Sequence, residues 1–100
     1  MTDQQQNYQL IKQKDDSVIV LRDVINIYHG ESLKDLLLTA IAYRQNIIIN
    51  MADLHEIDLA IMQLLVSTKM TAVTHGLTLT LSPVSDQAKH FLDLSALSFE

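Results

Sequence analysis

Hydrophobic positions in the first quarter of the chain recur with the short period of β-strands. Residues 8–13 alternate moderately, "DDS" at residues 15–17 has the composition of a turn, and "VIVLRDVINIY" from Val18 is rich in β-branched residues. This pattern predicts a hairpin whose second strand is buried on both faces over residues 18–21. The polar residues 1–7 are expected to form a flexible tail outside the folded domain.

The pattern then changes to helical spacing. Ser32 is the predicted N-cap of this helix, and Glu31 is expected near the positive end of the helix dipole. "NIIIN" at residues 46–50 is short, unbroken and β-branched, which is typical of a parallel strand covered on both faces. The apolar positions that recur at three and four residues in the predicted helix are Leu33, Leu36, Leu37, Ala40 and Ile41.

A second helical pattern runs from Asp58 to about His75, where Gly76 suits the position that ends a helix. Its apolar stripe is wide, so this helix is either deeply packed or in contact with something beyond its own domain. "LTLTLS" from Leu77 then alternates as a strand, and Ser85 is the predicted cap of a third helix. The predicted inward face of the second helix is Ile61, Leu64, Leu65, Thr68 and Ala72, widened by Met62, Val66, Met70 and Val73, and the third helix carries Ala88, Phe91 and Leu92.

The predicted order is β-β-α-β-α-β-α. Strands that alternate with helices imply parallel strands joined by right-handed crossovers. The prediction is therefore one α/β domain over residues 8–100, with a mixed sheet of about four strands and three helices.

Composition excludes several classes of protein. The chain has 100 residues, a net charge of −5 and no cysteine, so disulfides and thiolate sites are excluded. Its seven basic residues are scattered, which disfavours nucleic acids and anionic membranes as partners. The N-terminus lacks the features of a signal peptide and no apolar run reaches the roughly 20 residues that span a bilayer, so a cytoplasmic protein is expected.

The polar segment His55, Glu56 and Asp58 interrupts two apolar runs and invites a catalytic or metal-binding interpretation. A zinc-protease helix requires a second histidine four residues after the first, and position 59 is leucine. The chain also lacks a glycine-rich phosphate loop and a G-x-S-x-G motif. We therefore expect no enzyme, metal or cofactor, and interpret the segment as a solvated turn at a helix start. The other histidines (His29, His75 and His90) are expected at the surface or at helix ends, and Tyr28 and Tyr43 at the edges of the fold.

The same segment resembles the STAS domain, known from bacterial anti-sigma-factor antagonists and from regulatory tails of anion transporters. The family pattern is a buried strand, Asp-Leu-Ser-Gly-Val, two residues, Ile-Asp, and Ser-Ser-Gly-Leu opening a helix. Residues 50–62 align without a gap as NMADL, HE, ID and LAIM. "LRDVINIYHGESLKDLL" resembles the second strand and first helix of the family, and "HGLTLTLSPVSDQAKHFLDLSAL" its closing segment.

The departures from the family pattern concern its chemical switch. In the anti-sigma antagonists the second serine of Ser-Ser-Gly is phosphorylated by the partner kinase. Ala60 occupies that position here and Leu59 occupies the first serine position, so neither can accept phosphate. Asn26 and Asn50 replace two aspartates of the family.

The resemblance implies a bacterial, non-enzymatic regulatory domain that binds a protein without being phosphorylated at the usual site. The implied partner is a histidine-kinase-like ATPase, such as an anti-sigma factor, or a chemosensory component. The alternative is an accessory subunit of a bacterial phospholipid-transport ATPase. A small-ligand sensor and an unrecognised enzyme are further alternatives, and self-association through the wide stripe stays open.

The predicted interface lies at the carboxyl edge of the sheet, where α/β folds usually bind. It would combine residues 29–32, 58–62 and 83–85 and expose an apolar patch at the start of the central helix. For Leu59 and Ile61 the alternative is that they simply turn inward. The partner-binding residues predicted here are His29, Gly30, Asp58, Leu59, Ala60, Ile61, Met62 and Ser85.

Overall fold

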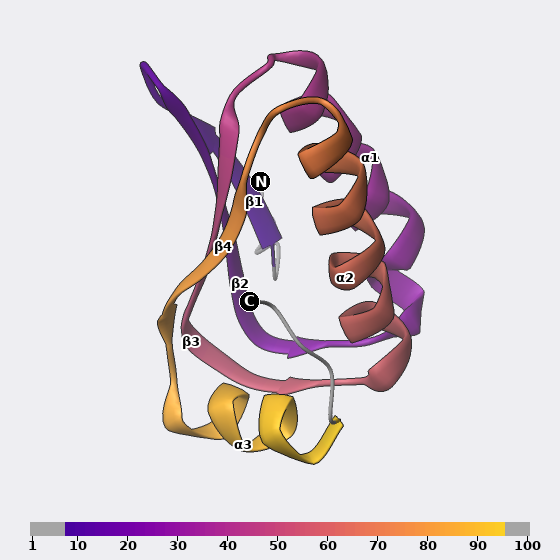
Figure 1. The fold of residues 1–100 in the computed structure, drawn as a ribbon. Coiled ribbons are helices and arrows are strands. Elements are labelled where there is room, and N and C mark those ends of the chain that lie inside the picture. The colour runs from indigo at the N-terminus through magenta and orange to yellow at the C-terminus, as the bar shows by residue number, and fades with distance from the viewer. Residues whose placement is uncertain (1–7, 96–100) are drawn as a thin grey trace, which may run out of the picture.

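The computed structural model describes residues 8–95, with side-chain surroundings described up to residue 90, so the predicted tail at residues 1–7 and the side chains of Phe91 and Leu92 lie outside the described part. A four-stranded sheet with the order β1-β2-β3-β4 forms one layer, and α1 and α2 pack against one of its faces (Figure 1). β1 is antiparallel to β2, whereas β3 pairs in parallel with both β2 and β4. The predicted element order and the mixed α/β fold are confirmed.

The N-terminal hairpin consists of β1 (Tyr8–Lys12) and β2 (Asp16–Ile25). β2 begins inside the predicted turn, because the Gln13 N–H donates to the Asp16 carbonyl (2.8 Å) and closes the turn earlier. Burial of β2 on both faces is also wrong: Ile19 and Leu21 are buried, but Val18 and Val20 are half-buried. The reason is that α1 and α2 both cover the same face of the sheet (Figure 1).

β3 (Asn46–Ile57) is much longer than the predicted strand at residues 46–50, and it includes the acidic segment that the sequence indicated as a turn. Two β-bulges explain the difference. Val20 and Arg22 of β2 oppose Asn50 and Asp53, so β3 holds an extra residue there, and a second extra residue follows before Glu56. Each extra residue moves the next inward-facing side chain one position further along β3. Burial therefore falls on Met51, Leu54 and Ile57 rather than on alternate positions.

The paired ends of β2 and β3 form a two-stranded extension, residues 22–25 and 53–57, which we call the β2–β3 arm. The last β3–β4 pair is Met51 with Val84, so the arm continues beyond β4. The arm bends beneath the starts of α1 and α2, with α3 on its other side (Figure 1). The arm thereby carries both helix starts away from the end of β4.

The first helix starts earlier than predicted. A short 3₁₀ helix, η1 (Ile27–His29), leads directly into α1 (Gly30–Ala42). The N-cap of α1 is His29 rather than Ser32, which is an exposed residue within the first turn. Glu31 lies in that first turn, as predicted. The predicted inward side chains Leu33, Leu37, Ala40 and Ile41 are buried.

α2 (Leu59–Thr74) has the predicted extent, with Asp58 as its N-cap. At its C-terminal end, Gly76 adopts the positive φ of 74° that glycine tolerates best. The Gly76 N–H donates to the Val73 carbonyl and the Leu77 N–H to the Ala72 carbonyl, both at 2.9 Å. This pair of bonds is the Schellman motif, and it satisfies two of the last carbonyls of the helix.

β4 (Leu79–Val84) and α3 (Asp86–Ser95) complete the fold. Ser85 caps α3 as predicted, because its Oγ accepts the Ala88 N–H at 3.0 Å. Among residues 8–95, no helix is long and apolar enough to cross a lipid bilayer. The buried hydrophobic core between the sheet and its helices consists of Ile19, Leu21, Ile25, Leu33, Leu37, Ala40, Ile41, Ile47, Ile49, Met51, Leu54, Ile57, Ile61, Met62, Leu65, Leu79 and Ala88.

Candidate protein-interaction surface

Asp58 joins three elements at the tip of the β2–β3 arm. Its Oδ1 accepts the Ile61 N–H at 3.4 Å, which caps α2, and its Oδ2 accepts the Ile27 N–H at 3.0 Å, which anchors η1. The Asp58 N–H donates to the Ile25 carbonyl at the end of β2 (3.2 Å). Asp58 therefore fixes the starts of both helices relative to the arm, and its predicted place at the helix start is confirmed.

η1 is held from its other side by Asn26 and His29. Asn26 Oδ1 accepts the Tyr28 N–H and the Asn26 N–H donates to His29 Nδ1, both at 3.0 Å. Because Nδ1 accepts this bond, the imidazole is the tautomer with its proton on Nε2. The ring also meets the Tyr8 ring edge-on, with centroids 5.7 Å apart. His29 is half-buried, and its hydrogen bond with the Asn26 N–H stabilises η1.

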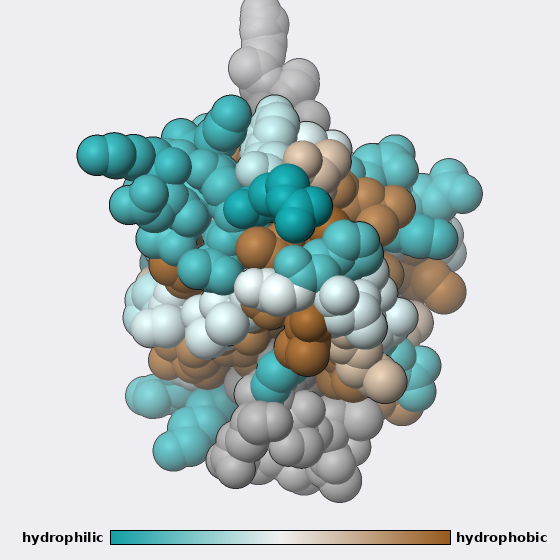
Figure 2. All heavy atoms as spheres, turned by 45° about the horizontal axis from the view of Figure 1, so that its top comes forward, coloured by the Kyte–Doolittle hydropathy of each residue, from teal (hydrophilic) through white to brown (hydrophobic). Residues whose placement is uncertain are grey.

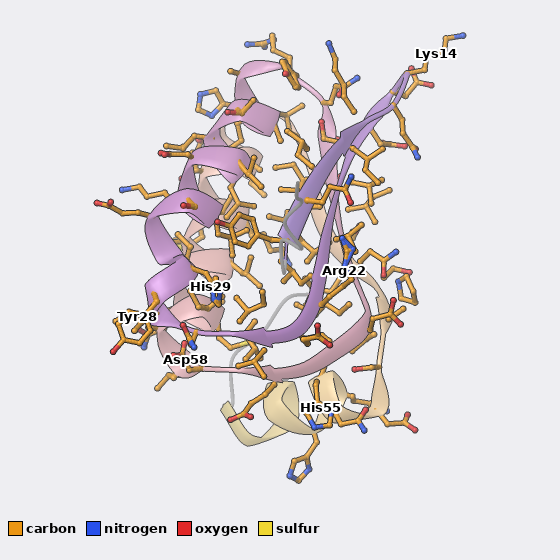
Figure 3. All side chains as sticks on the ribbon, turned by 180° about the vertical axis from the view of Figure 1, so that it is seen from behind. Lys14, Arg22, Tyr28, His29, His55 and Asp58 are labelled. Atoms are coloured by element: carbon orange, nitrogen blue, oxygen red, sulfur yellow. The ribbon has the colours of Figure 1, made fainter. Side chains whose placement is uncertain are left out.

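The hydrogen bonds of Asp58, Asn26 and His29 form a frame that leaves apolar side chains facing outward at the tip of the β2–β3 arm. Tyr28 is 91% exposed, Ile27 is 62% exposed and Leu59 is 54% exposed, with Ala60 exposed beside them. Figure 3 shows Tyr28 next to Asp58 at the end of the arm, pointing away from the fold. We call the exposed set Ile27, Tyr28, Leu59 and Ala60 the η1–α2 surface. An apolar side chain held outward on a rigid turn is a typical feature of protein interfaces.

The predicted exposure of the whole α2 start is wrong for two residues. Ile61 and Met62 are each only 1% exposed, so neither side chain is available to a partner. A Cβ placed on Gly30 would lie 3.8 Å from Ile61 Cδ1, which puts Ile61 against the start of α1. The first turn of α2 therefore divides, with Leu59 and Ala60 outward and Ile61 and Met62 in the core.

Ser85 does not join the η1–α2 surface. Its Oγ donates to the Leu54 carbonyl at 2.7 Å and its N–H donates to the Met51 carbonyl at 3.1 Å. Leu54 precedes Asp58 by four residues, about 13 Å along a strand. The predicted convergence of residues 83–85 with the two helix starts is therefore wrong. β3 extends beyond the end of β4, so the tip of the β2–β3 arm lies away from the start of α3.

The acidic segment does not form a metal-binding cluster in the described region. His55 and Glu56 are exposed on the arm, and Figure 3 places His55 beside α3, away from Tyr28. Within residues 8–90, no group of three His, Asp or Glu side chains is arranged to hold a metal ion.

Sequence reasoning missed Ile27 and Tyr28 as surface residues, since Tyr28 was expected to pack at an edge of the fold. The signal was present in "NIYH": Asn26 is a good cap and His29 follows it three residues later. A capped turn at that point ends the strand at Ile25 and turns the next two side chains outward. Tyr43, the other tyrosine expected at an edge, does lie at one, where Lys12 Nζ is 4.2 Å from its ring centroid.

Comparison with solved structures finds proteins that contain a similar fold. Two chains, titled "Crystal Structure Analysis of Mglu" and "Crystal Structure Analysis of Mglu in its native form", superpose with TM-scores of 0.67 and 0.58, each at 17% sequence identity. They cover 78% and 72% of this chain, whereas this chain spans only 20% and 21% of theirs. At such low identity the similarity shows the fold alone.

Comparison with protein families is more specific. No curated protein matches this sequence. The STAS domain profile, however, matches residues 7–100, which is nearly the whole chain. This is the family that the aligned segment from Asn50 to Met62 resembles, and its members act as regulatory protein-interaction domains. The chain belongs to the STAS domain family.

Proposed function

We propose that this chain is a non-enzymatic docking domain that binds its protein partner through the η1–α2 surface. The observation that carries the proposal is the exposure of Ile27, Tyr28 and Leu59 on a frame whose polar groups are already bonded. Because the Asp58 and Asn26 side chains are engaged within the fold, little ordering is required when a partner binds. Tyrosine is enriched among the few residues that supply most of the binding energy in protein interfaces, and preorganisation lowers the cost of binding.

The proposed docking is constitutive at the position where phosphorylation controls the anti-sigma antagonists. Ala60 is exposed, so a kinase would have access to it, but it carries no hydroxyl to accept phosphate. Leu59 beside it is likewise inert. The α2 N-terminus therefore cannot gain the charge of about −1.5 to −2 that a phosphoserine brings. Partner binding through the apolar side chains is therefore not switched on or off by phosphate at this position.

The proposed partner is a histidine-kinase-like ATPase or a chemosensory component. The acidic residues near the η1–α2 surface indicate the charge expected on the partner's contact surface. Glu31 follows η1 on α1 and Glu56 lies on the arm, and both are exposed. Their negative charges lie three residues after Tyr28 and three residues before Leu59 in the sequence. A matching surface would have an apolar centre and a basic rim, because complementary potentials favour association.

Capture of the partner from native cells tests the proposal directly. The tagged wild-type chain is compared with Tyr28→Ala, which removes the most exposed aromatic ring, and with Ala60→Glu, which adds a charge to the patch. Both variants are expected to lose the partner while keeping their circular dichroism spectra.

The matched control is Tyr43→Ala, which removes a tyrosine at the opposite end of α1, about 20 Å along the helix. It should retain the partner. Equal recovery by Tyr28→Ala and Tyr43→Ala would contradict docking at the η1–α2 surface. Recovery of a transport ATPase instead of a kinase-like ATPase would favour the role of a phospholipid-transport accessory subunit.

Incubation with the captured kinase and ATP tests the absence of a switch. Intact-mass measurement should show an unchanged chain. Added phosphate on any residue would contradict the constitutive mode.

A further inference from the structure

Tyr8, the first residue of β1, contacts the turn that carries the η1–α2 surface. It pairs with Leu21 of β2 and is half-buried against the hydrophobic core. Its ring meets the His29 imidazole edge-on, with centroids 5.7 Å apart and ring planes at 71°. Aromatic rings attract each other in this T-shaped arrangement when their centroids are about 4.5–7 Å apart. The N-terminal strand and η1 are therefore in direct contact.

The imidazole that Tyr8 contacts completes the cap of η1. Its Nδ1 accepts the Asn26 N–H, while Asn26 Oδ1 accepts the Tyr28 N–H, both at 3.0 Å. A neutral imidazole can accept at Nδ1 only as the tautomer protonated on Nε2, and only when its ring is turned toward the donor. η1 has three residues, so helix hydrogen bonding alone does not stabilise it. The geometry of η1 therefore depends on how the His29 ring is held.

We propose that Tyr8 is a positioning residue for the η1–α2 surface and that it acts through His29. The Tyr8 ring restricts the imidazole to the orientation in which Nδ1 accepts the Asn26 N–H. That hydrogen bond keeps η1 closed, and η1 directs Ile27 and Tyr28 outward, where they are 62% and 91% exposed. The inference rests on the proposed function only for the effect on the partner, since the contact of Tyr8 with η1 lies within the chain.

The two ends of β1 make different contacts, which supplies a matched control. At the far end, Lys12 Nζ lies 4.2 Å from the centroid of the Tyr43 ring. Residues 12–15 are exposed there, and Figure 2 shows hydrophilic side chains gathered at the upper left, the side on which Figure 1 places the hairpin tip. Tyr43 is the C-cap residue of α1, whereas His29 is its N-cap residue. Loss of either tyrosine ring removes a contact between β1 and an end of α1, but only loss of the Tyr8 ring releases the imidazole.

The size of the effect follows from the strength of an aromatic pair, which corresponds to a factor of about two to ten in a local equilibrium. Tyr8→Leu and Tyr8→Met keep an apolar side chain against the core but have no ring. Both should shift η1 toward its open form by that factor while the domain stays folded. Tyr8→Phe keeps the ring and should restore the behaviour of the wild type.

Nitrogen NMR of the imidazole at about pH 8, where an ordinary histidine is neutral, tests the step from Tyr8 to His29. The His29 signals are identified by their loss in His29→Gln. The wild type, Tyr8→Phe and Tyr43→Leu should show one protonated and one proton-free ring nitrogen, as the Nε2–H tautomer requires. In Tyr8→Leu and Tyr8→Met the two signals should move toward each other, because the tautomers mix. An unchanged tautomer in both of these variants would overturn the proposal.

Amide hydrogen exchange measures the next step, from His29 to the backbone of η1. Relative to amides in the middle of α2, the Asn26 and Tyr28 amides should exchange about two- to tenfold faster in Tyr8→Leu than in the wild type. In Tyr8→Phe they should exchange at the wild-type rate. Equal acceleration in Tyr8→Leu and Tyr43→Leu would show only a weaker attachment of β1 and would contradict a positioning role.

The protein recovered with the tagged wild-type chain is the probe for the effect on docking. Its affinity for Tyr8→Leu should be about two- to tenfold lower than for the wild type, and Tyr8→Phe should restore it. Normal binding by Tyr8→Leu, combined with loss of binding by Tyr28→Ala, would show that Tyr8 does not position the surface. If neither substitution affects binding, docking at the η1–α2 surface is refuted, and the NMR and exchange measurements still decide whether Tyr8 holds η1.

Discussion

Replacement of Asp58 by alanine removes the side chain that connects the β2–β3 arm, η1 and α2. The loss of an N-cap acceptor costs about 1 kcal/mol. The loss of the carboxylate acceptor of the Ile27 N–H costs about 1 kcal/mol more, because this bond is solvent-accessible and its donor can turn to water. The expected destabilisation is thus about 2 kcal/mol, which lowers the Tm of a 100-residue domain by about 8–16 °C.

Thermal unfolding followed by circular dichroism measures this loss, and amide hydrogen exchange locates it. The Ile27 and Ile61 amides should exchange faster in Asp58→Ala, whereas amides in the middle of α2 should change only through global stability. Asp58→Asn keeps an acceptor oxygen and should restore more than half of the lost Tm. Asp53→Ala, which removes an exposed carboxylate from the same strand, serves as the control. An equal Tm for the Asp58→Ala and Asp53→Ala variants would refute the assigned role of Asp58.

Three further predictions test the local structure. Gly76→Ala should cost about 1 kcal/mol in urea unfolding because an alanine Cβ disfavours its φ of 74°, whereas Gly30→Ala, in helical conformation with 3.8 Å of clearance, should be neutral or slightly stabilising; similar losses for both would contradict this account. Met62→Asp should abolish the cooperative unfolding transition, because it places a carboxylate in the core, whereas Leu59→Asp should stay folded; a well-folded Met62→Asp would show that Met62 is not interior. Ser85→Ala should lower the unfolding free energy by about 1–2 kcal/mol, since one hydroxyl both caps α3 and donates to the arm, and unchanged stability would argue against that double role.

Elements with a single simple period were predictable from the sequence. Four of the five predicted inward residues of α1 are buried, and β4 alternates but begins at Leu79, two residues later than predicted. The cap at Ser85 and the helix start at Asp58 were also predictable, because each precedes an apolar helical pattern by one residue or a few. These positions depend on local chemistry that the sequence displays directly.

The β2–β3 arm was not predictable, because its period comes from two bulges. Burial of Met51, Leu54 and Ile57 at every third position, with exposed residues between, resembles the edge of a helix or a loop more than a strand. The extra residues that create this period can be recognised only once β2 is paired beside β3.

The candidate site was predictable in location but not in membership. The place of Asp58, Leu59 and Ala60 follows from the family resemblance. Whether Ile61 faces inward, however, depends on the position of α1, whose first residue lies against it. The outward direction of Tyr28 depends on the 3₁₀ turn between Asn26 and His29, which the hydrophobic pattern does not reveal.

The arm also determines what kind of sequence change this protein tolerates. His55 is exposed on the arm, so its identity is free to vary. The number of residues between Met51 and Ile57 is not free, because adding or deleting one would rotate Leu54 or Ile57 out of the interior and displace Asp58 from the Ile27 amide. Homologous sequences should therefore differ in composition along this segment while conserving its length.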